Sequence, residues 1–273
     1  MQKIDRLGWA DGIAFRSYGL RIGVRVSDAA VMNSVIDRLP PGWKPAASPI
    51  VDHLYSIVVG GHSRGSRIQR FNLLYYDAGR FGRTKDFELL LKTFESYLQL
   101  LVADNARRRI FVHAGVVGWK NQAIMIPGMS FSGKTTLVSK LVQAGAKYYS
   151  DEYAVLDERG LVHPFPRPLG IRRPHEFDTT RVDVGSLGGV RGAKPLPVRL
   201  VISTNYRAGA RWRPRQLTRG RGVLELLANT VSARSQTHLA LSTLPKAIRF
   251  AEVLKGVRGE ADEIVKTILD RVA

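Results

Sequence analysis

The sequence contains no cysteine, and this absence excludes several classes of site together. Without thiols the chain has no disulfide bonds, no thiolate metal ligands and no cysteine nucleophile. The histidines outside residue 113 show no metal-ligand spacing, so no zinc site is predicted. A G-x-S-x-G pattern occurs at residues 61–65, but it lies in a glycine- and serine-rich turn between two strand-like segments and not between a strand and a helix, which argues against a serine hydrolase.

Long apolar runs are missing as well. The most apolar segment, residues 87–103, is interrupted by Lys92 and Glu95, and it falls short of the roughly 20 apolar residues that a membrane span requires. Residues 1–15 have no apolar stretch behind their charges, so they do not resemble a signal peptide. We therefore expect a soluble cytoplasmic protein with no membrane partner.

Acidic residues are few: 23 stand against 42 lysines and arginines, for a formal net charge of +19. The excess is concentrated between Arg159 and Arg221, a segment with 14 basic and three acidic residues. Such a surface attracts phosphorylated ligands, acidic peptides, nucleic acid or acidic lipid. An arginine-rich composition on a solvated face explains the same numbers, and both interpretations remain open.

The hydrophobic pattern predicts an α/β protein of two domains. Residues 1–108 read as a smaller α+β domain whose role the sequence does not reveal. It should contain two strands around Tyr18-Gly19, a helix capped by Ser27 or Asp28, strands within 53–59 and 67–77, and a long helix over 84–107 capped by Thr84. Residues 109–273 form the second domain.

In the second domain, buried strands are expected over 110–119 and 122–127, followed by a loop and a helix over 135–146 that Gly145 stops. A hairpin over 153–165 and a strand over 198–206 come next. From Gly222 onward the pattern is helical again, in residues 222–235 and 260–272.

A glycine-rich loop lies between the strand 122–127 and the helix: Gly128, four residues, then Gly133-Lys134-Thr135. In a G-x-x-x-x-G-K-[ST] loop, backbone N–H groups and the helix N-terminus bind phosphates, the lysine reaches the outer phosphates, and the Ser/Thr hydroxyl ligates Mg²⁺. A glycine-rich turn that happens to contain a lysine is the alternative. The residues predicted to bind the nucleotide are Gly128, Ser130, Ser132, Gly133, Lys134, Thr135 and Thr136.

The acidic pair Asp151-Glu152 follows one helix-length later. If Tyr148-Tyr149 form a strand beside the one that ends at Pro127, both carboxylates lie at strand ends next to the phosphates, where a Mg²⁺ ligand or a base belongs. A simple polar turn over 150–152 is the alternative. No N-K-x-D segment is present, as a GTPase would require, and "KYYSDEY" is too short and polar for the acidic strand of a transport ATPase.

Four segments, residues 111–115, 128–136, 146–157 and 163–174, together resemble the HPr serine kinase family. They are most similar to the branch called HPr-kinase-related kinases (type A), which has a P-loop nucleotide-binding fold akin to that of phosphoenolpyruvate carboxykinase. The resemblance covers residues 110–180 well and the rest only in general shape.

This resemblance implies transfer of the γ-phosphate of ATP, with Mg²⁺, to a hydroxyl that is typically a serine. Asp151 matches the acid that deprotonates the acceptor, Glu152 takes the place of the second acid, and Thr135 with this pair would hold the metal. His113 matches the histidine on the strand before the loop; without the resemblance, a core histidine is as good an interpretation.

Two departures from the family narrow the expected substrate. Phe131 stands where the founding family has a glycine, and the Leu-Glu-x-Arg-Gly segment of true HPr kinases has no match. We therefore expect neither the reverse, phosphorylase reaction nor HPr as the substrate. Relatives of this branch accompany peptide-maturation systems, where the acceptor is a serine of a small peptide.

The basic segment follows the predicted site directly, so some of its arginines are expected to select an acidic or phosphorylated acceptor. Nucleic acid is not an expected partner, and homo-oligomerisation is left open. The competing interpretation is a nucleotide-binding regulatory or scaffold protein whose basic face holds nucleic acid or an acidic partner. The arginines considered for the acceptor are Arg167, Arg172 and Arg173, with Arg207, Arg211 and Arg213 further along.

Overall fold

The computed structural model describes residues 3–62, 69–129, 132–172 and 179–272. It is a mixed α/β structure whose chain divides into two compact units, Met1–Arg107 and Arg108–Ala273. Within the described ranges, no helix is long and apolar enough to cross a membrane.

The first unit is a six-stranded sheet with one long helix. The sheet order is β3-β1-β2-β4-β7-β8, and only β2 and β4 run parallel. Helix α2 packs on β7 and β8 through an apolar stripe that includes Leu90 and Phe94. The elements are η1 (Lys3–Arg6), β1 (Asp11–Ser17), β2 (Leu20–Val26), η2 (Ala29–Val31), α1 (Met32–Ile36), β3 (Lys44–Pro45), β4 (His53–Val58), β5 (Gly61–His62), β6 (Gln69–Arg70), β7 (Asn72–Tyr76), β8 (Gly79–Thr84) and α2 (Phe87–Asn105).

The predicted hairpin around Tyr18-Gly19 is confirmed, but the predicted start of the long helix is wrong. Thr84 ends β8, a strand that the sequence did not indicate, and α2 begins three residues later. Its cap is Asp86, whose carboxylate accepts from the Leu89 N–H at 3.1 Å. Asp28 caps the short η2 in the same way, by accepting from the Ala30 N–H.

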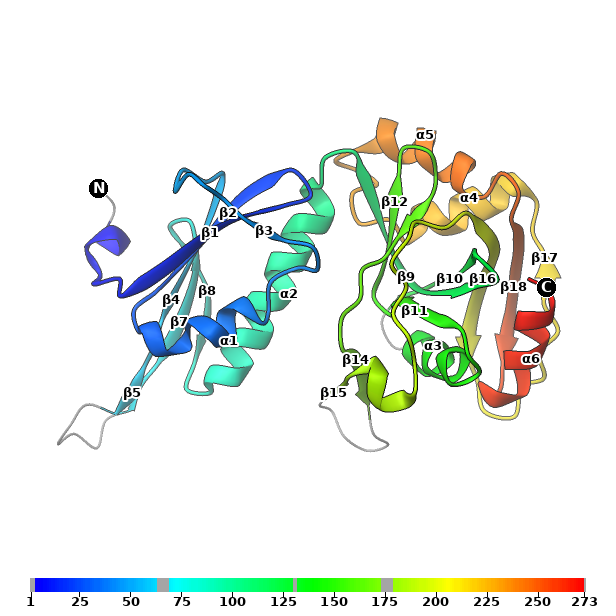
Figure 1. Ribbon diagram of the computed structural model, residues 1–273, viewed down its shortest axis with the longest axis horizontal. Coiled ribbons are helices and arrows are strands. Elements are labelled where there is room, and N and C mark those ends of the chain that lie inside the picture. Colours follow the sequence, from blue (N-terminus) through cyan, green and yellow to red (C-terminus); the bar gives the residue numbers. More distant parts are fainter. Residues whose placement is uncertain (1–2, 63–68, 130–131, 173–178, 273) are drawn as a thin grey trace. The chain divides into compact units, whose positions relative to one another are not determined.

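The second unit is an eight-stranded sheet covered on both faces (Figure 1). The order β13-β12-β9-β10-β16-β18-β17 has β11 as a further partner of β9. The elements are β9 (Arg109–Trp119), β10 (Gln122–Pro127), α3 (Lys134–Gln143), β11 (Lys147–Ser150), β12 (Tyr153–Asp157), β13 (Val162–His163), β14 (Leu169–Arg172), β15 (Thr179–Val182), η3 (Val184–Leu187), β16 (Val198–Tyr206), β17 (Arg215–Gln216), α4 (Arg219–Ala228), α5 (Thr237–Ala247), β18 (Glu252–Arg258) and α6 (Asp262–Asp270).

Each face of this sheet has its own apolar core. Along β9 and β10, alternate buried residues such as Val112 and Met125 pack with α4 and α5. Their neighbours, such as Val117 and Ile124, pack with α3 and α6 on the opposite face. Figure 1 shows these two helix pairs on opposite sides of the strands. Strands buried on both faces explain the continuous apolar runs in the sequence.

The predicted strand–loop–helix and the 153–165 hairpin are confirmed, and each of the two segments predicted to be helical after Gly222 contains a helix: α4 ends at Ala228, within 222–235, and α6 lies within 260–272. The stretch after Gly222 also holds elements that were not predicted. That stretch contains β18, which pairs in parallel with β16 in the middle of the sheet. It also holds α5, which includes Pro245 and is separate from α4, the helix capped by the Thr218 hydroxyl.

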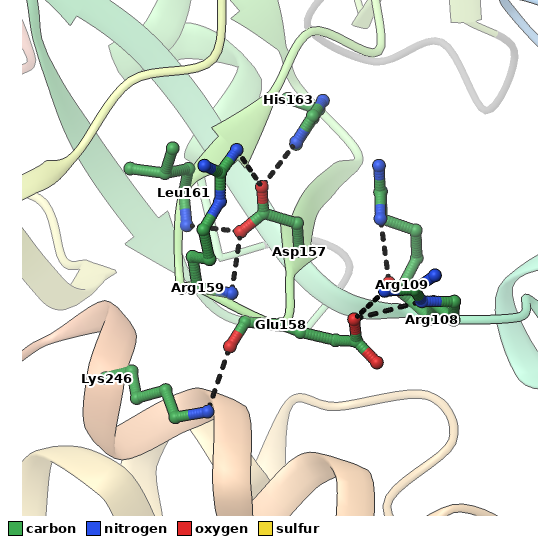
Figure 2. Close-up of polar contacts among 8 residues, drawn as sticks. All are labelled: Arg108, Arg109, Asp157, Glu158, Arg159, Leu161, His163 and Lys246. Carbon is green, nitrogen blue, oxygen red and sulfur yellow. Dashed lines mark hydrogen bonds and ion pairs between the residues drawn. The ribbon is translucent and has the colours of Figure 1, made fainter.

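The hairpin β12–β13 is closed by the buried carboxylate of Asp157 (Figure 2). One oxygen accepts from the N–H groups of Arg159 and Leu161, both at 3.0 Å, and the other lies 3.0 Å from His163 Nε2. Next to it, the Glu158 side chain pairs with Arg108 at 2.7 Å, and its carbonyl accepts from the Lys246 ammonium. The turn is therefore fixed by an internal polar network.

An Asp157→Asn variant should lower the free energy of unfolding by about 1–3 kcal/mol, because the buried acceptor loses its charge. Burial acts to raise the pKa of Asp157, but the hydrogen bonds from His163, Leu161 and Arg159 outweigh it and lower the pKa. A depressed carboxyl pKa stabilises the fold above the unfolded-state pKa of about 3.9 and stops doing so as the pH falls through the folded value.

The difference between wild type and variant in urea unfolding should therefore shrink from pH 7 toward pH 3. Asp270→Asn, on the exposed end of α6, is the control and should change little. A difference that does not vary with pH would contradict the role of the Asp157 charge.

Candidate functional site

The 128–133 loop joins the end of β10 to the start of α3. Gly133 is the N-cap of α3 and has a left-handed backbone, φ 83°. Among the described residues no side chain caps this end, so the first N–H groups of the helix suit a ligand, and the helix dipole favours an anion there. Thr136 lies exposed in the first turn, while Ser130 falls outside the described residues.

The Lys134 ammonium is folded back over this loop and donates to the Met129 carbonyl at 2.8 Å. Burial lowers its pKa, while the negative charges of Asp151 and Glu152 act in the opposite direction. The lysine is therefore held near both the loop and the acidic pair.

The acidic pair reaches the loop by a different route from the one predicted. Strand β11 pairs with β9, not with β10, so the prediction that Tyr148-Tyr149 lie beside the strand ending at Pro127 is wrong. Since β10 occupies one edge of β9, β11 and β12 follow each other along the opposite edge. The step between them is residues 151–152, and Pro127 pairs with Ala114, whose N–H donates to the Glu152 carbonyl at 3.1 Å.

Helix α3 closes the remaining gap because it packs tightly on β9. Gly115 makes this possible, since a Cβ there would lie 2.5 Å from Val138 of the helix. The Thr135 hydroxyl consequently donates to Asp151 Oδ2 at 3.2 Å. This contact brings the helix after the glycine-rich loop against the first acid of the pair.

Two further groups fix Asp151. The Tyr148 hydroxyl lies 2.8 Å from Asp151 Oδ1, and the Gly170 N–H donates to Oδ2 at 3.3 Å. The same hydroxyl lies 2.8 Å from the Arg167 carbonyl, so its single proton serves one acceptor at a time. Burial first, and then the charge of Asp151, raises the pKa of Tyr148, so the phenol remains protonated.

Tyr148 was predicted only as part of a strand, and its contact with Asp151 was missed. The only sign in the sequence was a tyrosine three residues before an aspartate. This spacing indicates a contact only when the pairing of β11 with β9 is known. For the ATP-dependent transfer that the sequence predicts, Tyr148→Phe should lower turnover about tenfold with little change in ATP affinity, because one hydrogen bond to a charged group is lost, and such a bond contributes about 1.5–3 kcal/mol.

The measurement for Tyr148 is a double-mutant cycle with Asp151→Asn. The effects should not add, because the hydroxyl acts through that carboxylate. Tyr149→Phe, whose hydroxyl donates to the Lys194 carbonyl, is the control. Additive losses would assign Tyr148 a purely structural role.

The Glu152 side chain has a different partner from those of Asp151. Its carboxylate accepts a hydrogen bond from the Arg167 guanidinium, an ion pair between a partly buried acid and a mostly buried arginine. Burial raises the pKa of Glu152 and Asp151 adds to this, while Arg167 and Lys134 oppose it. Arg167, expected to meet the acceptor, is thus placed on the second acid.

His113 links β9 to the loop through its backbone. Its N–H donates to the Asn229 carbonyl at 2.7 Å, and its carbonyl accepts from the Gly128 N–H at 3.1 Å. The ring lies 4.8 Å from the Tyr153 ring, centre to centre. Burial, followed by the charge of Lys134, lowers the pKa of His113, which keeps the imidazole neutral at pH 7.

Two of the arginines predicted for the acceptor cannot be assigned contacts. Arg173 falls outside the described residues, and for Arg172 only the backbone, in β14, is described. Elsewhere in the basic segment, Arg191 pairs with Asp183 and Arg199 donates to the Phe250 carbonyl. The arginines left exposed after the end of β16 are Arg207, Arg211, Arg213, Arg215, Arg219 and Arg221.

The oxygen atoms at the site suit a hard cation such as Mg²⁺. Thr135 Oγ1 and an Asp151 oxygen are neighbours at 3.2 Å. Mg²⁺ commonly uses one or two carboxylates together with phosphate oxygens and water, so a full protein cage is not required. Among the described residues, no group of three or more His, Asp or Glu side chains is arranged to hold a metal alone.

One more side chain meets the loop and was missed entirely. Arg258, the last residue of β18, donates from Nη2 to the Gly133 carbonyl at 2.8 Å. No motif in the sequence singles out this arginine, and no strand was predicted over residues 252–258.

A scan against models of protein families gives no match, and a search of curated proteins also gives none.

Proposed function

We propose that this chain is a cytoplasmic ATP- and Mg²⁺-dependent kinase of the HPr-kinase-like type, with a P-loop in its second unit. It would transfer the γ-phosphate of ATP to a hydroxyl, most simply a serine of a peptide or protein. The observation that carries the proposal is the contact between Thr135 and Asp151 at 3.2 Å. It unites a helix start suited to phosphate with a carboxylate suited to a metal or a proton.

Phosphate binding is assigned to the 128–133 loop and the first turn of α3. Backbone N–H groups there would hold the phosphate oxygens, and Lys134 would exchange its bond to the Met129 carbonyl for a phosphate oxygen. That exchange needs only a rotation of the lysine side chain. Among the predicted loop residues, Ser132 and Gly133 are close enough to Lys134 in the chain to share the same ligand.

Thr135 and Asp151 would hold Mg²⁺, with Glu152 beside them. The ion would neutralise charge on the bridging and γ oxygens. The protein contributes fixed oxygen atoms, since Tyr148 and the Gly170 N–H orient the Asp151 carboxylate before any ligand arrives.

The acceptor proton is assigned to Asp151 as base. A serine hydroxyl is a poor nucleophile, and a carboxylate within hydrogen-bond reach can accept its proton as the P–O bond forms. The neutral imidazole of His113 can donate a hydrogen bond to an oxygen of the transferring group. Glu152 is the second candidate base, because burial raises its pKa.

The acceptor is proposed to be acidic or phosphorylated, selected by basic residues near the carboxyl ends of the strands. The backbone of Arg172 lies two residues after Gly170, whose N–H donates to Asp151, while Arg173 lies outside the described residues. Arg207 is exposed and directly follows the carboxyl end of β16. A homo-oligomer would be compatible with this arrangement.

A nucleotide-binding regulatory or scaffold role is the second candidate. It is favoured by the engagement of both acids: Asp151 accepts hydrogen bonds from Thr135 and Gly170, and Glu152 is paired with Arg167. Acids held in this way can shape a binding site without catalysing transfer. The exposed arginines after β16 would then hold an acidic partner or nucleic acid, with a steep dependence on salt.

The deciding experiment supplies γ-labelled ATP and Mg²⁺ to the wild-type protein together with a host extract divided into peptide-sized and smaller fractions. Label that appears in a new species, and that is lost when Mg²⁺ is chelated, would support the kinase, and the fraction would identify the acceptor class. ATP binding without a labelled product in any fraction would favour the regulatory role instead.

A further inference from the structure

Arg258 ends β18 and is almost fully buried, with 1% of its surface exposed. Strand β18 lies next to β16, which lies next to β10, and all three run in the same direction. The pairing continues to Tyr206 and Arg258, beyond the level at which β10 has already ended. Their carboxyl ends therefore extend past Pro127 and bring Arg258 beneath the loop.

The guanidinium is held by carbonyl oxygens and by an aromatic ring. Nη2 donates to the Gly133 carbonyl and Nη1 to the Gly259 carbonyl, both at 2.8 Å. The Tyr206 ring centre lies 5.6 Å from Cζ, and the Tyr206 hydroxyl is fixed by a 2.7 Å bond to Glu260. The fit is tight, since a Cβ on Gly133 would lie 2.5 Å from Nη2.

This positive charge is compensated only in part: Glu260, which accepts from the Tyr206 hydroxyl, attracts it electrostatically but forms no ion pair with it. In the part of the chain that the structure describes, Arg258 forms no ion pair within 4 Å, and its Nε has no hydrogen-bond partner. Ser132 Oγ, one residue before Gly133, is likewise buried without a partner among the described residues. Burying a charge in this way is costly unless another group compensates it.

The position of Arg258 beside the N-terminus of α3 makes its buried charge still less favourable when no ligand is bound. A helix N-terminus carries partial positive charge, so a cation beside it is repelled. Arg258 touches the residue that caps α3, and Lys134 begins the same helix. Two cations and a helix dipole thus converge on one loop, which is the arrangement that a polyanion would stabilise.

We propose that Arg258 is a positioning residue for polyphosphate: it fixes the Gly133 carbonyl at the helix cap and contributes a buried positive charge beneath the bound phosphates. This rests on the proposed nucleotide-binding function and names a residue that the G-x-x-x-x-G-K-[ST] pattern does not contain. The ligand it serves is the phosphate chain of a nucleoside triphosphate, not the base.

The test measures binding of ATP and of inorganic tripolyphosphate by calorimetry, and steady-state transfer where an acceptor is known. Arg258→Met should weaken binding of both ligands at least tenfold and raise the KM for ATP more than it lowers kcat. Arg258→Lys keeps the charge but loses the two-carbonyl geometry, so its affinity should lie between that of Met and wild type.

Arg271→Met is the matched control. This arginine pairs with Glu252, at the opposite end of the same strand, and is half-exposed, so its loss should leave ATP affinity unchanged. Circular dichroism and urea unfolding establish that each variant is folded. If Arg258→Met does not fold, the comparison of Arg258→Lys with wild type decides, and unchanged affinity for tripolyphosphate overturns the proposal.

The outcomes separate this inference from the kinase assignment. Wild-type binding that weakens in Arg258→Met, without transfer to any acceptor, would support the role of Arg258 and overturn the kinase. Phosphate transfer by wild type, with equal ATP affinity in wild type and Arg258→Met, would support the kinase and overturn the role of Arg258. Equal affinities of Arg258→Lys and Arg258→Met would overturn the proposed role of the positive charge. A wild-type protein that binds neither ligand would overturn both proposals.

Discussion

An Asp151→Asn variant is expected to transfer phosphate about a thousandfold more slowly than wild type, within the range reported for loss of a general base, while its affinity for ATP changes only a few-fold. Asparagine has the same shape: its one carbonyl oxygen can accept from Thr135, and its NH2 group can donate to the Tyr148 hydroxyl, which then donates to the Arg167 carbonyl. It cannot accept the proton of a hydroxyl, and it carries no charge for a metal.

The measurement pairs kcat for the transfer reaction with the Kd for ATP in the absence of acceptor. Asp183→Asn serves as the control, because that carboxylate pairs with Arg191 and caps η3, outside the site. Glu152→Gln is measured beside it. A larger loss of kcat in Glu152→Gln than in Asp151→Asn would move the role of base to Glu152, in line with its raised pKa.

Lys134→Met should lower kcat/KM for ATP about a thousandfold, since it removes the only flexible cation in the G-x-x-x-x-G-K-[ST] segment and with it electrostatic stabilisation of the transferring phosphate. Methionine retains most of the apolar stem, so the packing of the helix start is preserved. The affinity for ATP should fall as well, because the same charge serves both the bound and the reacting phosphates.

Helix α3 offers a matched control for this variant. Lys140 lies six residues later on the same helix and pairs with Asp262 at 3.1 Å on the surface. Lys140→Met should leave both kinetic constants close to wild type. Equal effects of the two substitutions would indicate a nonspecific loss of positive charge and would count against a phosphate contact for Lys134.

Local signals predicted those parts of the second unit that depend on short stretches of chain. The apolar runs of β9 and β10, the glycine-rich loop and the amphipathic α3 follow each other directly, so their pattern is legible. The helix stop at Gly145 is local in the same sense. Strand β18 was missed because "EVLKGVR" alternates little and is flanked by helical segments, and its burial depends on the distant β16.

The residues of the candidate site also divide into those that a local motif predicts and those that only the fold brings together. Lys134, Thr135 and Asp151 could be proposed from the sequence because each belongs to a recognisable motif. The partners of Asp151 could not, because the Tyr148 and Gly170 contacts require that β11 lie on β9 and that the chain return to the same place 19 residues later. Arg258 meets a residue 125 positions away, a separation that no local pattern encodes.

Strand β9 has a consequence for the size of the group that the site can accept. The glycine-rich loop begins at one of its edges and the acidic pair lies at the other, so the two backbones are about two strand spacings, roughly 9.5 Å, apart. Because β9 is hydrogen-bonded to a strand on each edge, it holds the loop and the acidic pair at a fixed separation. Side chains can adjust within that span, but its width is a property of the sheet, so in the proposed kinase reaction it would be the backbone separation that the phosphate chain and the acceptor together have to bridge.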